Sequence, residues 1–212
     1  MSALPSDPDL AARIRAATAL RRLGHAIVGH DVDRSLLDSV AVAVEGWLPR
    51  VEAGRPRSRS IDTMKKHMFE APAEGAPIGT FPDCVVSGEA NPMGLDVRFY
   101  REGQEAVSRV VLGPAFEGAP NRAHGGIVAA VFDDLMGFVL HILESPAYTG
   151  ELTVRYHAPT PVNTEIEFRG WLKERRGRKM RIEARATHAG QKIASASALF
   201  VAIPPDRFEH RA

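Results

Sequence analysis

Hydrophobic residues in the first fifty positions recur at helical spacing. Asp7 and Pro8 are typical of a helix start, because a side-chain acceptor suits the N-cap and proline suits the first helical position. Two apolar stripes follow, the second of them after Asp33, and both fit a period of 3.6 residues better than a period of 2. Their members are Leu10, Ile14, Ala17, Leu20 and Leu23 or Ile27, and then Leu36, Leu37, Val40, Val44, Trp47, Leu48 and Val51. The pattern predicts a helical hairpin.

The pattern changes after residue 54. Helix breakers and charges fill residues 54–60, and a run rich in proline and glycine covers residues 71–82. We therefore divide the chain into an N-terminal helical extension with its linker, residues 1–80, and a second domain, residues 81–212. In that domain, stretches of β-branched and alternating residues separated by turn residues predict strands. They cover residues 95–101 and 106–112, joined by a hairpin turn at 102–104, and later residues 152–158, 165–174, 179–188 and 192–203.

One segment between these strands, residues 126–143, is apolar around most of its helical circumference. A surface helix would show a single apolar stripe, so this helix has to be enclosed by other elements. Strands, one helix and then further antiparallel strands make an α+β plan. We expect a hot-dog fold, an antiparallel β-sheet wrapped around a central α-helix and preceded here by the N-terminal helical extension.

Composition excludes several classes of protein. The 27 Lys and Arg residues nearly balance the 26 Asp and Glu residues, so net charge gives no reason to expect nucleic acid or an anionic membrane as a partner. Cys84 is the one cysteine; it allows no internal disulfide and no cysteine-based zinc site, and we expect it in a strand, at least half-buried. Asp133, Asp134 and His141 interrupt the apolar helix, which argues against a transmembrane span. We predict a soluble, cytoplasmic protein without a metal site.

The start of the central helix carries the first chemical signal. His124, Gly125 and Gly126 stand there, and glycines at a helix N-terminus let another group approach the backbone closely. The first amides of a helix are free and lie at the positive end of its dipole, so an oxyanion or a carbonyl oxygen would bind well. The alternative is that these three residues only form a tight entry from strand to helix.

A carboxylate inside the same helix is the second signal. Burying a carboxylate without partners costs several kcal/mol and raises its pKa, a property that suits a general base. Asp133 is thus a candidate base or nucleophile, unless it caps a neighbouring loop or forms a buried ion pair. Asp134 lies about 100° further round the helix and is a candidate structural partner.

The spacing of these two signals predicts an assembly. Gly125 and Asp133 are eight residues apart, about 12 Å along a helix, which is too far for both to touch one carbonyl carbon. If they cooperate, they come from different chains, whose antiparallel central helices meet across a dimer axis. This reasoning predicts an obligate dimer with two interfacial sites.

Together these motifs resemble one family. The triplet His124-Gly125-Gly126, Asp133 and the downstream motif Tyr156-x-x-Pro159 are similar to the hot-dog acyl-CoA thioesterases of the phenylacetate-pathway and thioesterase-superfamily-member branch. The resemblance covers residues 87–203. It implies that the Gly125 amide polarises the thioester carbonyl, that Asp133 acts as nucleophile or activates water, and that His124 holds the loop geometry.

The resemblance also assigns further residues. Thr149 would orient the attacking water, although it could equally be a turn residue that starts a strand. A net charge of +5 over residues 173–181 marks a basic hairpin that would bind the phosphates of coenzyme A, unless it is only a solvated tip. The residues that would contact substrate are Asn91, Gly126, Arg155, His157, Arg175, Arg178 and Lys179.

The function implied is hydrolysis of an acyl-CoA to a free acid and coenzyme A by a homodimer, with no cofactor besides the coenzyme A of the substrate. Whether dimers pair into a dimer of dimers stays open. Two alternatives remain: a non-catalytic acyl-CoA-binding or regulatory module, and a hot-dog dehydratase, which would arrange its histidine and acid differently. The extension could cover the acyl tunnel, enlarge the dimer interface or bind another protein. We expect it to pack on its own or a neighbouring hot-dog domain.

Overall fold

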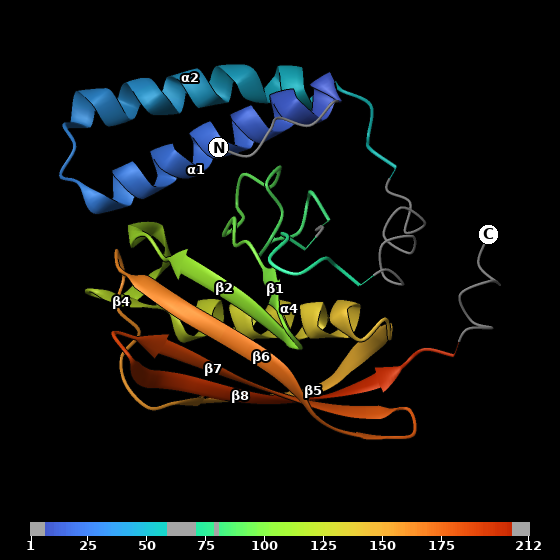
Figure 1. Cartoon of the computed structure of the whole chain (residues 1–212). Coiled ribbons are helices and arrows are strands. Elements are labelled where there is room, and N and C mark those ends of the chain that lie inside the picture. The colour runs from blue at the N-terminus through green and yellow to red at the C-terminus, as the bar shows by residue number, and fades with distance from the viewer. Residues whose placement is uncertain (1–6, 59–70, 79–80, 205–212) are drawn as a thin grey trace.

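A computed structural model describes residues 7–58, 71–78 and 81–204 of the chain, arranged as a two-helix arm above a curled sheet (Figure 1). The arm consists of α1 (Pro8–Gly29) and α2 (Arg34–Glu52). Asp7 caps α1 as predicted, since its side chain accepts hydrogen bonds from the amides of Asp9 and Leu10. The predicted boundary at residue 80 falls on residues 79–80, outside the described part of the chain.

A six-stranded antiparallel sheet forms the second domain, with strand order β1-β2-β6-β7-β8-β5. Its strands are β1 (Tyr100–Glu102), β2 (Glu105–Val111), β5 (Ala147–Tyr156), β6 (Glu165–Arg176), β7 (Lys179–His188) and β8 (Gln191–Ala202). A short helix, η1 (Pro114–Phe116), and a two-stranded ribbon, β3 (Glu117–Ala119) with β4 (Arg122–Ala123), lead into the central helix. This order leaves β1 and β5 as the two edges of the large sheet.

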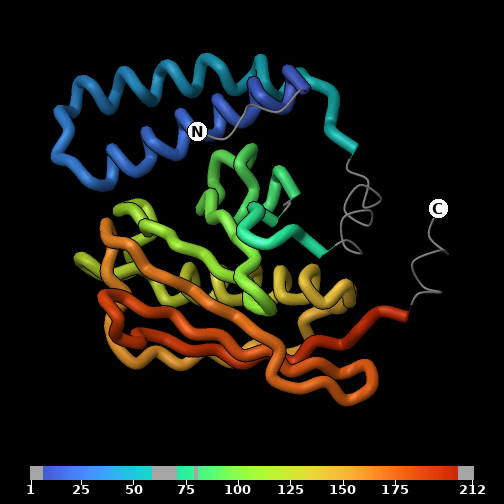
Figure 2. The backbone as a smooth tube through the Cα atoms, in the orientation of Figure 1, coloured from blue at the N-terminus to red at the C-terminus, as the bar shows by residue number. Residues whose placement is uncertain are grey.

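The central helix α4 (Gly125–Ile142) lies against the concave face of this sheet (Figure 2). Half of its residues are buried, and they pack with Phe168, Ile182 and Phe200 of the sheet. Gly170 of β6 lets the helix come close, because a Cβ there would lie 3.3–3.4 Å from side-chain atoms of Leu135 and Val139. By length and composition α4 could also cross a membrane, but here it is the core helix. The predicted hot-dog fold is confirmed.

Two strand predictions need correction. The strand expected over residues 95–101 is reduced to β1, because Asp96 adopts a positive φ of 56° and residues 97 and 99 form backbone hydrogen bonds with Val86 and Ile78, which belong to no strand. Val97 and Phe99 are still buried, but the amide of Val97 is bonded to the carbonyl of Val86 in a loop. Cys84 is half-buried as expected, yet it lies in this loop and not in a strand.

The two arm helices pack differently. On α1, Ala11 and Ala17 are buried, and Arg21 donates hydrogen bonds to the carbonyls of Glu89 and Asn91. By contrast, α2 buries no residue. The expectation that the second stripe packs on the chain's own hot-dog domain is therefore wrong, because α1 lies between α2 and that domain (Figure 1).

Candidate active site

The entry into α4 is built around His124. This residue is the N-cap, and its ring Nδ1 accepts a hydrogen bond from the Gly126 amide at 2.9 Å. Its Cα and Cβ would lie under 3 Å from a Cβ at position 118, so Gly118 of β3 is needed for this packing. Because His124 occupies the Gly126 amide, Gly126 has no free donor for a substrate. We therefore expect the Gly125 amide to contact substrate in place of the Gly126 amide.

The Gly125 amide is the free donor. Within the described residues it has no hydrogen-bond acceptor, as expected for the first amide of a helix. The Tyr156 hydroxyl of β5 donates to the Gly125 carbonyl at 2.6 Å, which fixes the peptide that follows this amide. Burial raises the pKa of Tyr156, so the phenol keeps the proton that it donates. Sequence reasoning gave Tyr156 no role; its place on the strand beside the glycine triplet was the available signal.

The second half of the candidate site pairs Asp133 with Thr149. The Thr149 hydroxyl donates to a carboxylate oxygen of Asp133 at 3.2 Å. Thr149 faces α4 because of a bulge at Gly150: the register shifts between Thr149 and Glu151, which places the two side chains on opposite faces of β5. Thr149 thus lies beside Asp133 and its hydroxyl contacts the carboxylate itself, whereas its predicted role of orienting water stays a prediction.

Burial distinguishes the two aspartates in a way that the sequence did not predict. Asp133 is exposed on the open face of α4, whereas Asp134 is partly buried. Burial raises the pKa of Asp134, and the neighbouring charge of Asp133 adds to the increase. Ser87 hydrogen-bonds to this carboxylate, and Cys84 Sγ lies 3.8 Å from both of its oxygens. Asp134 thus fits the predicted structural role, and the desolvation expected at Asp133 is absent from the single chain.

The raised pKa of Asp134 makes stability depend on pH. The folded state holds the proton of Asp134 more tightly than the unfolded chain does. The stabilising contribution of this proton to the free energy of unfolding is therefore fully present below the unfolded pKa of 3.8, and it is lost as pH rises through the folded pKa. Asp134→Asn removes the titration and keeps an oxygen acceptor for Ser87. We expect its free energy of unfolding, relative to wild type, to increase from pH 4 to pH 7. Urea unfolding at a series of pH values measures this, and a difference that is flat or decreasing would contradict the assignment.

Asn91 makes its hydrogen bonds within its own loop and to the arm. Its side-chain amide donates to the carbonyl of Asp83, and its side-chain oxygen accepts from the Met93 amide, so both polar groups close the loop in which it lies. Its backbone carbonyl is held by Arg21 of α1. In the single chain the polar groups of Asn91 thus stabilise the junction between the arm and the hot-dog domain, and its substrate contact stays a prediction.

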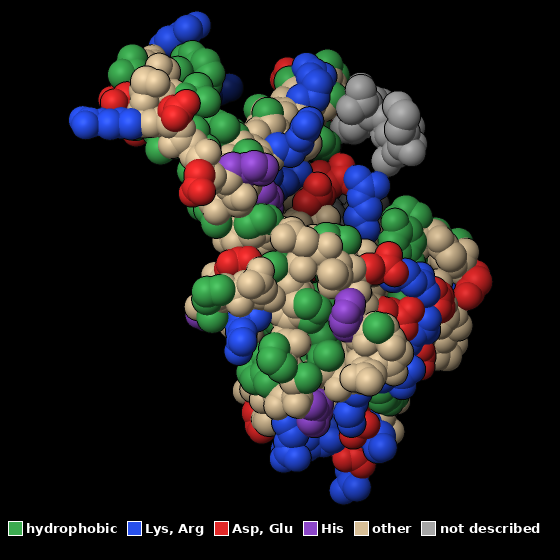
Figure 3. Space-filling model, turned by 90° about the vertical axis from the view of Figure 1, so that its left-hand side faces the viewer, with side chains coloured by type: hydrophobic (Ala, Val, Ile, Leu, Met, Phe, Trp, Pro, Cys, Tyr) green, Lys and Arg blue, Asp and Glu red, His purple; other side chains and the backbone are tan. Residues whose placement is uncertain are grey.

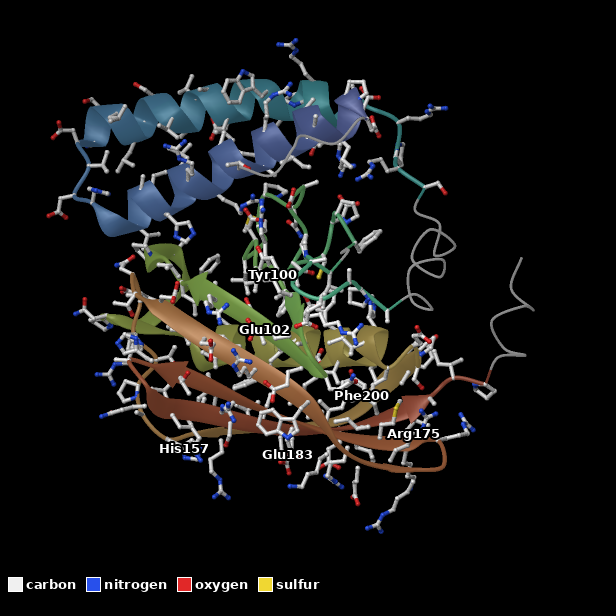
Figure 4. The ribbon with its side chains drawn as sticks, viewed as in Figure 1. Tyr100, Glu102, His157, Arg175, Glu183 and Phe200 are labelled. Carbon is white, nitrogen blue, oxygen red and sulfur yellow. The ribbon has the colours of Figure 1, made fainter. Side chains whose placement is uncertain are left out.

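The residues predicted to bind coenzyme A form two groups rather than one. His157 and Arg175 lie at opposite ends of the sheet (Figure 4). His157 follows β5 on the outer face, with Nε2 2.8 Å from Ser195 Oγ, and Arg155 is exposed beside it. At the other end, Arg178 donates to the carbonyl of Ala202 and Lys179 is exposed. A single chain does not bring these two basic groups together.

Comparison with known proteins agrees with this geometry. Residues 121–195, which hold the glycine triplet, both aspartates, Thr149 and Tyr156, match the thioesterase superfamily. The match covers the central helix and the strands that follow it, up to the first residues of β8. A crystal structure of another thioesterase superfamily protein superimposes with a TM-score of 0.77 at 25% identity, over 95% of this chain and 94% of that one. That coverage takes in the arm as well as the hot-dog domain.

A curated protein that is similar to this chain has a named activity. Acyl-coenzyme A thioesterase THEM4 of Mus musculus is 28% identical over 112 residues. The match covers 51% of this chain and 48% of that protein, so the chain matches only about half of the length of this relative.

Proposed function

We propose that this protein hydrolyses acyl-coenzyme A thioesters to a free carboxylic acid and coenzyme A. The match of residues 121–195 to the thioesterase superfamily supports a thioesterase, and the named activity of the mouse relative supports an acyl-CoA substrate. The reaction consumes one water and transfers no electrons, so the chemistry calls for an oxyanion donor and a carboxylate. The free Gly125 amide and the Asp133–Thr149 pair supply those two groups.

The observation that carries the proposal is how these groups are placed along α4. Gly125 and Asp133 are eight residues apart, about 12 Å of helix, and lie within about 80° of each other around it. On β5, Tyr156 beside Gly125 and Thr149 beside Asp133 are seven residues apart, about 23 Å of strand. One chain therefore holds the Gly125 amide and the Asp133 carboxylate at separate places on the same open face. We call them the amide half and the carboxylate half of the proposed site.

A twofold axis between two copies would join the halves. The open face of α4 carries small residues, Ala129, Ala130 and Gly137, which allow a second helix to come close. Next to it, β5 is an edge strand; of the strands in the described residues it pairs with β8 alone, so its other side can pair with another strand. Antiparallel pairing would set Gly125 of each chain against Asp133 of the other. It would also remove Asp133 from water, supplying the burial that is absent from the single chain.

The chemistry follows from this placement. The Gly125 amide would donate to the thioester oxygen and stabilise the negative charge that develops there. Asp133 of the facing chain would attack the carbonyl carbon or take the proton from an attacking water, with Thr149 holding one carboxylate oxygen in place. Collapse of the tetrahedral intermediate would then break the carbon–sulfur bond and release coenzyme A as a thiolate, which takes up the proton that comes from water. Where Asp133 itself attacks, the acyl group is left on Asp133 as an anhydride, and water then cleaves this anhydride to the free acid and restores the carboxylate.

The dimer would also unite the two basic groups. The hairpin with Arg175, Arg178 and Lys179 is at the Thr149 end of the sheet, and Arg155 with His157 is at the Tyr156 end. Antiparallel pairing would bring the hairpin of one chain to the Arg155 end of the other. Such a cluster suits the phosphates of coenzyme A, since guanidinium groups bind phosphate in bidentate fashion.

Thiol release from a panel of acyl-CoAs tests the proposal. The panel should hold short, medium, long and aromatic acyl groups, with free coenzyme A measured by a thiol-trapping reagent. Hydrolysis of at least one member at a rate proportional to enzyme concentration is expected. Tight binding of acyl-CoAs without any turnover would instead favour a binding or regulatory module, and absence of both would contradict the proposal.

Two substitutions of Thr149 test whether its hydroxyl supports the reaction through Asp133. Thr149→Val keeps the shape of the side chain and removes the hydroxyl that contacts Asp133. Loss of a hydrogen bond to a charged group, about 1.5–3 kcal/mol, predicts a kcat about 10 to 100 times lower. Thr149→Ser keeps the hydroxyl, so its kcat should stay within about threefold of the wild-type value, a smaller loss than the one expected for Thr149→Val. Equal rates for the valine and serine variants would show that Thr149 only starts the strand.

A further inference from the structure

The last two turns of α1 pack on the segment that leads into the candidate active site. His25 lies edge-on against the ring of Phe116 in η1, with ring centroids 4.8 Å apart and an interplanar angle of 83°. Four residues further along the same face of α1, Gly29 comes close to Pro114, since a Cβ there would lie 3.0 Å from the proline Cγ. Figure 1 shows the turn that follows β2 beneath this end of α1. The arm therefore contacts η1 directly.

One hydrogen bond joins the arm to the backbone of η1. The Ala115 amide donates to Nδ1 of His25 at 3.1 Å. An amide in the first turn of a helix has no partner within that helix, so His25 caps it from another element. Gly113 makes room for the ring, because a Cβ there would lie 2.5–2.7 Å from two of its atoms. Burial of His25 and, to a smaller extent, the charge of Arg21 lower its pKa, so at neutral pH the ring is uncharged and Nδ1 can accept.

The next residue of η1 holds His124. The carbonyl of Phe116 accepts a hydrogen bond from the His124 amide at 2.8 Å. His124 caps α4 by accepting a hydrogen bond from the Gly126 amide, and this leaves the amide of Gly125 as the free donor. A series of contacts thus runs from His25 of the arm, through two adjacent residues of η1, to the start of α4.

We infer that His25 is a positioning residue for the oxyanion donor of the proposed site. By holding the Ala115 amide, it fixes the carbonyl of Phe116 to which the His124 amide is bonded. The position of His124 in turn sets the direction of the Gly125 amide. An oxyanion donor stabilises the transition state best when it is already held in place before the reaction. The effect of His25 on rate rests on the proposed function, whereas its connection to the start of α4 does not.

Other contacts keep the arm in place when this hydrogen bond is removed. Two ion pairs, Arg13 with Asp83 and Arg21 with Asp96, anchor α1 on the loop before β1. Figure 3 shows the arm as a lobe that projects beyond the hot-dog domain. Ala115 is exposed, so water can replace the acceptor that its amide loses. Loss of this bond should therefore shift η1 and leave the fold intact.

Two substitutions of His25 in the full-length protein separate the acceptor from the ring. His25→Phe keeps an aromatic ring but places a C–H where Nδ1 accepts. We expect its kcat to be about 3 to 10 times lower, the value of one hydrogen bond, with KM within about twofold of wild type. His25→Asn keeps an acceptor oxygen near the position of Nδ1, so its kcat should stay within about twofold of wild type. The matched control is His30→Phe, because Nδ1 of His30 contacts the Ala26 carbonyl of its own helix, and its kcat should equal that of wild type.

A double substitution shows whether His25 acts through the Gly125 amide. Gly125→Pro removes the hydrogen of that amide, so adding His25→Phe to it should change kcat by less than about twofold. A loss that multiplies instead would place the effect of His25 elsewhere and overturn the inference. Equal kcat values for His25→Phe and wild type would overturn it as well, and so would a loss in His25→Asn as large as that in His25→Phe.

Amide hydrogen exchange gives a reading that needs no turnover. Measured by NMR, the amides of His124 and Gly126 should exchange about 3 to 10 times faster in His25→Phe than in wild type. The amide of Leu135, in the middle of α4, should not change, and His30→Phe should change none of the three. Unchanged exchange at His124 and Gly126 would contradict the inference. Faster exchange in a protein that hydrolyses no acyl-CoA would keep the connection between the arm and α4 and remove the proposed function.

Discussion

Asp133→Asn is expected to lower acyl-CoA hydrolysis at least about a hundredfold, the usual size of the loss when a general base or nucleophile is removed. The amide has nearly the shape of the carboxylate and can still accept a hydrogen bond from Thr149, so the geometry is kept. What is lost is the charge that attacks the thioester or takes a proton from water. The effect should appear in kcat, because the side chain contributes to chemistry more than to binding.

The measurement is the initial rate of thiol release with the best substrate of the panel. Asp31→Asn makes the same change in the exposed segment between α1 and α2 and should leave the rate unchanged. Unfolding curves of both variants check that the fold is retained. A rate for Asp133→Asn within tenfold of wild type would show that the carboxylate lies outside the reaction.

A comparison of two variants at Gly125 isolates the oxyanion donor. Gly125 is the first residue of α4, where proline is tolerated, and His124 has the extended backbone that a following proline requires. Alanine and proline both add a Cβ, 3.2–3.3 Å from Tyr156, but only proline removes the N–H. Gly125→Pro should therefore hydrolyse about 100 to 1,000 times more slowly than Gly125→Ala, the loss expected for one oxyanion donor.

Substrate affinity and stability provide the controls for this pair. Both variants should unfold at similar temperatures, and their KM values should stay close, because the amide acts on the transition state more than on the bound substrate. Equal kcat values for Gly125→Ala and Gly125→Pro would mean that the amide of Gly125 does not polarise the carbonyl.

The sequence predicted the elements with strong periodic signals. Enclosure of α4 follows from its apolar circumference, and β6, β7 and β8 follow from long β-branched runs between turn residues. The segment after Asp96 was mispredicted because Asp96 has a positive φ and the strand-like residues that follow it bond to loop residues Val86 and Ile78. Local sequence does not report such a conformation at an aspartate.

The candidate site was predictable only in part. The glycine triplet and Asp133 were found because helix starts and carboxylates in apolar helices have a direct chemical meaning. Which of Asp133 and Asp134 is buried depends on how α4 is turned on the sheet, and that is decided by tertiary packing. Thr149 faces α4 through the bulge at Gly150, which arises from pairing with β8. The hydrogen bonds of Asn91 to its own loop were not predicted, because they depend on how residues 83–93 fold together.

Mixing two inactive variants tests most directly the claim that each site is shared between two chains. Asp133→Asn keeps the amide half, and Gly125→Pro keeps the carboxylate half. In a mixed dimer of twofold symmetry, one of the two sites would combine an intact Gly125 with an intact Asp133. After unfolding and refolding at a 1:1 ratio, half of the dimers are mixed, so hydrolysis should recover to about a quarter of the wild-type rate per chain. A mixture no more active than its two components would contradict the shared site.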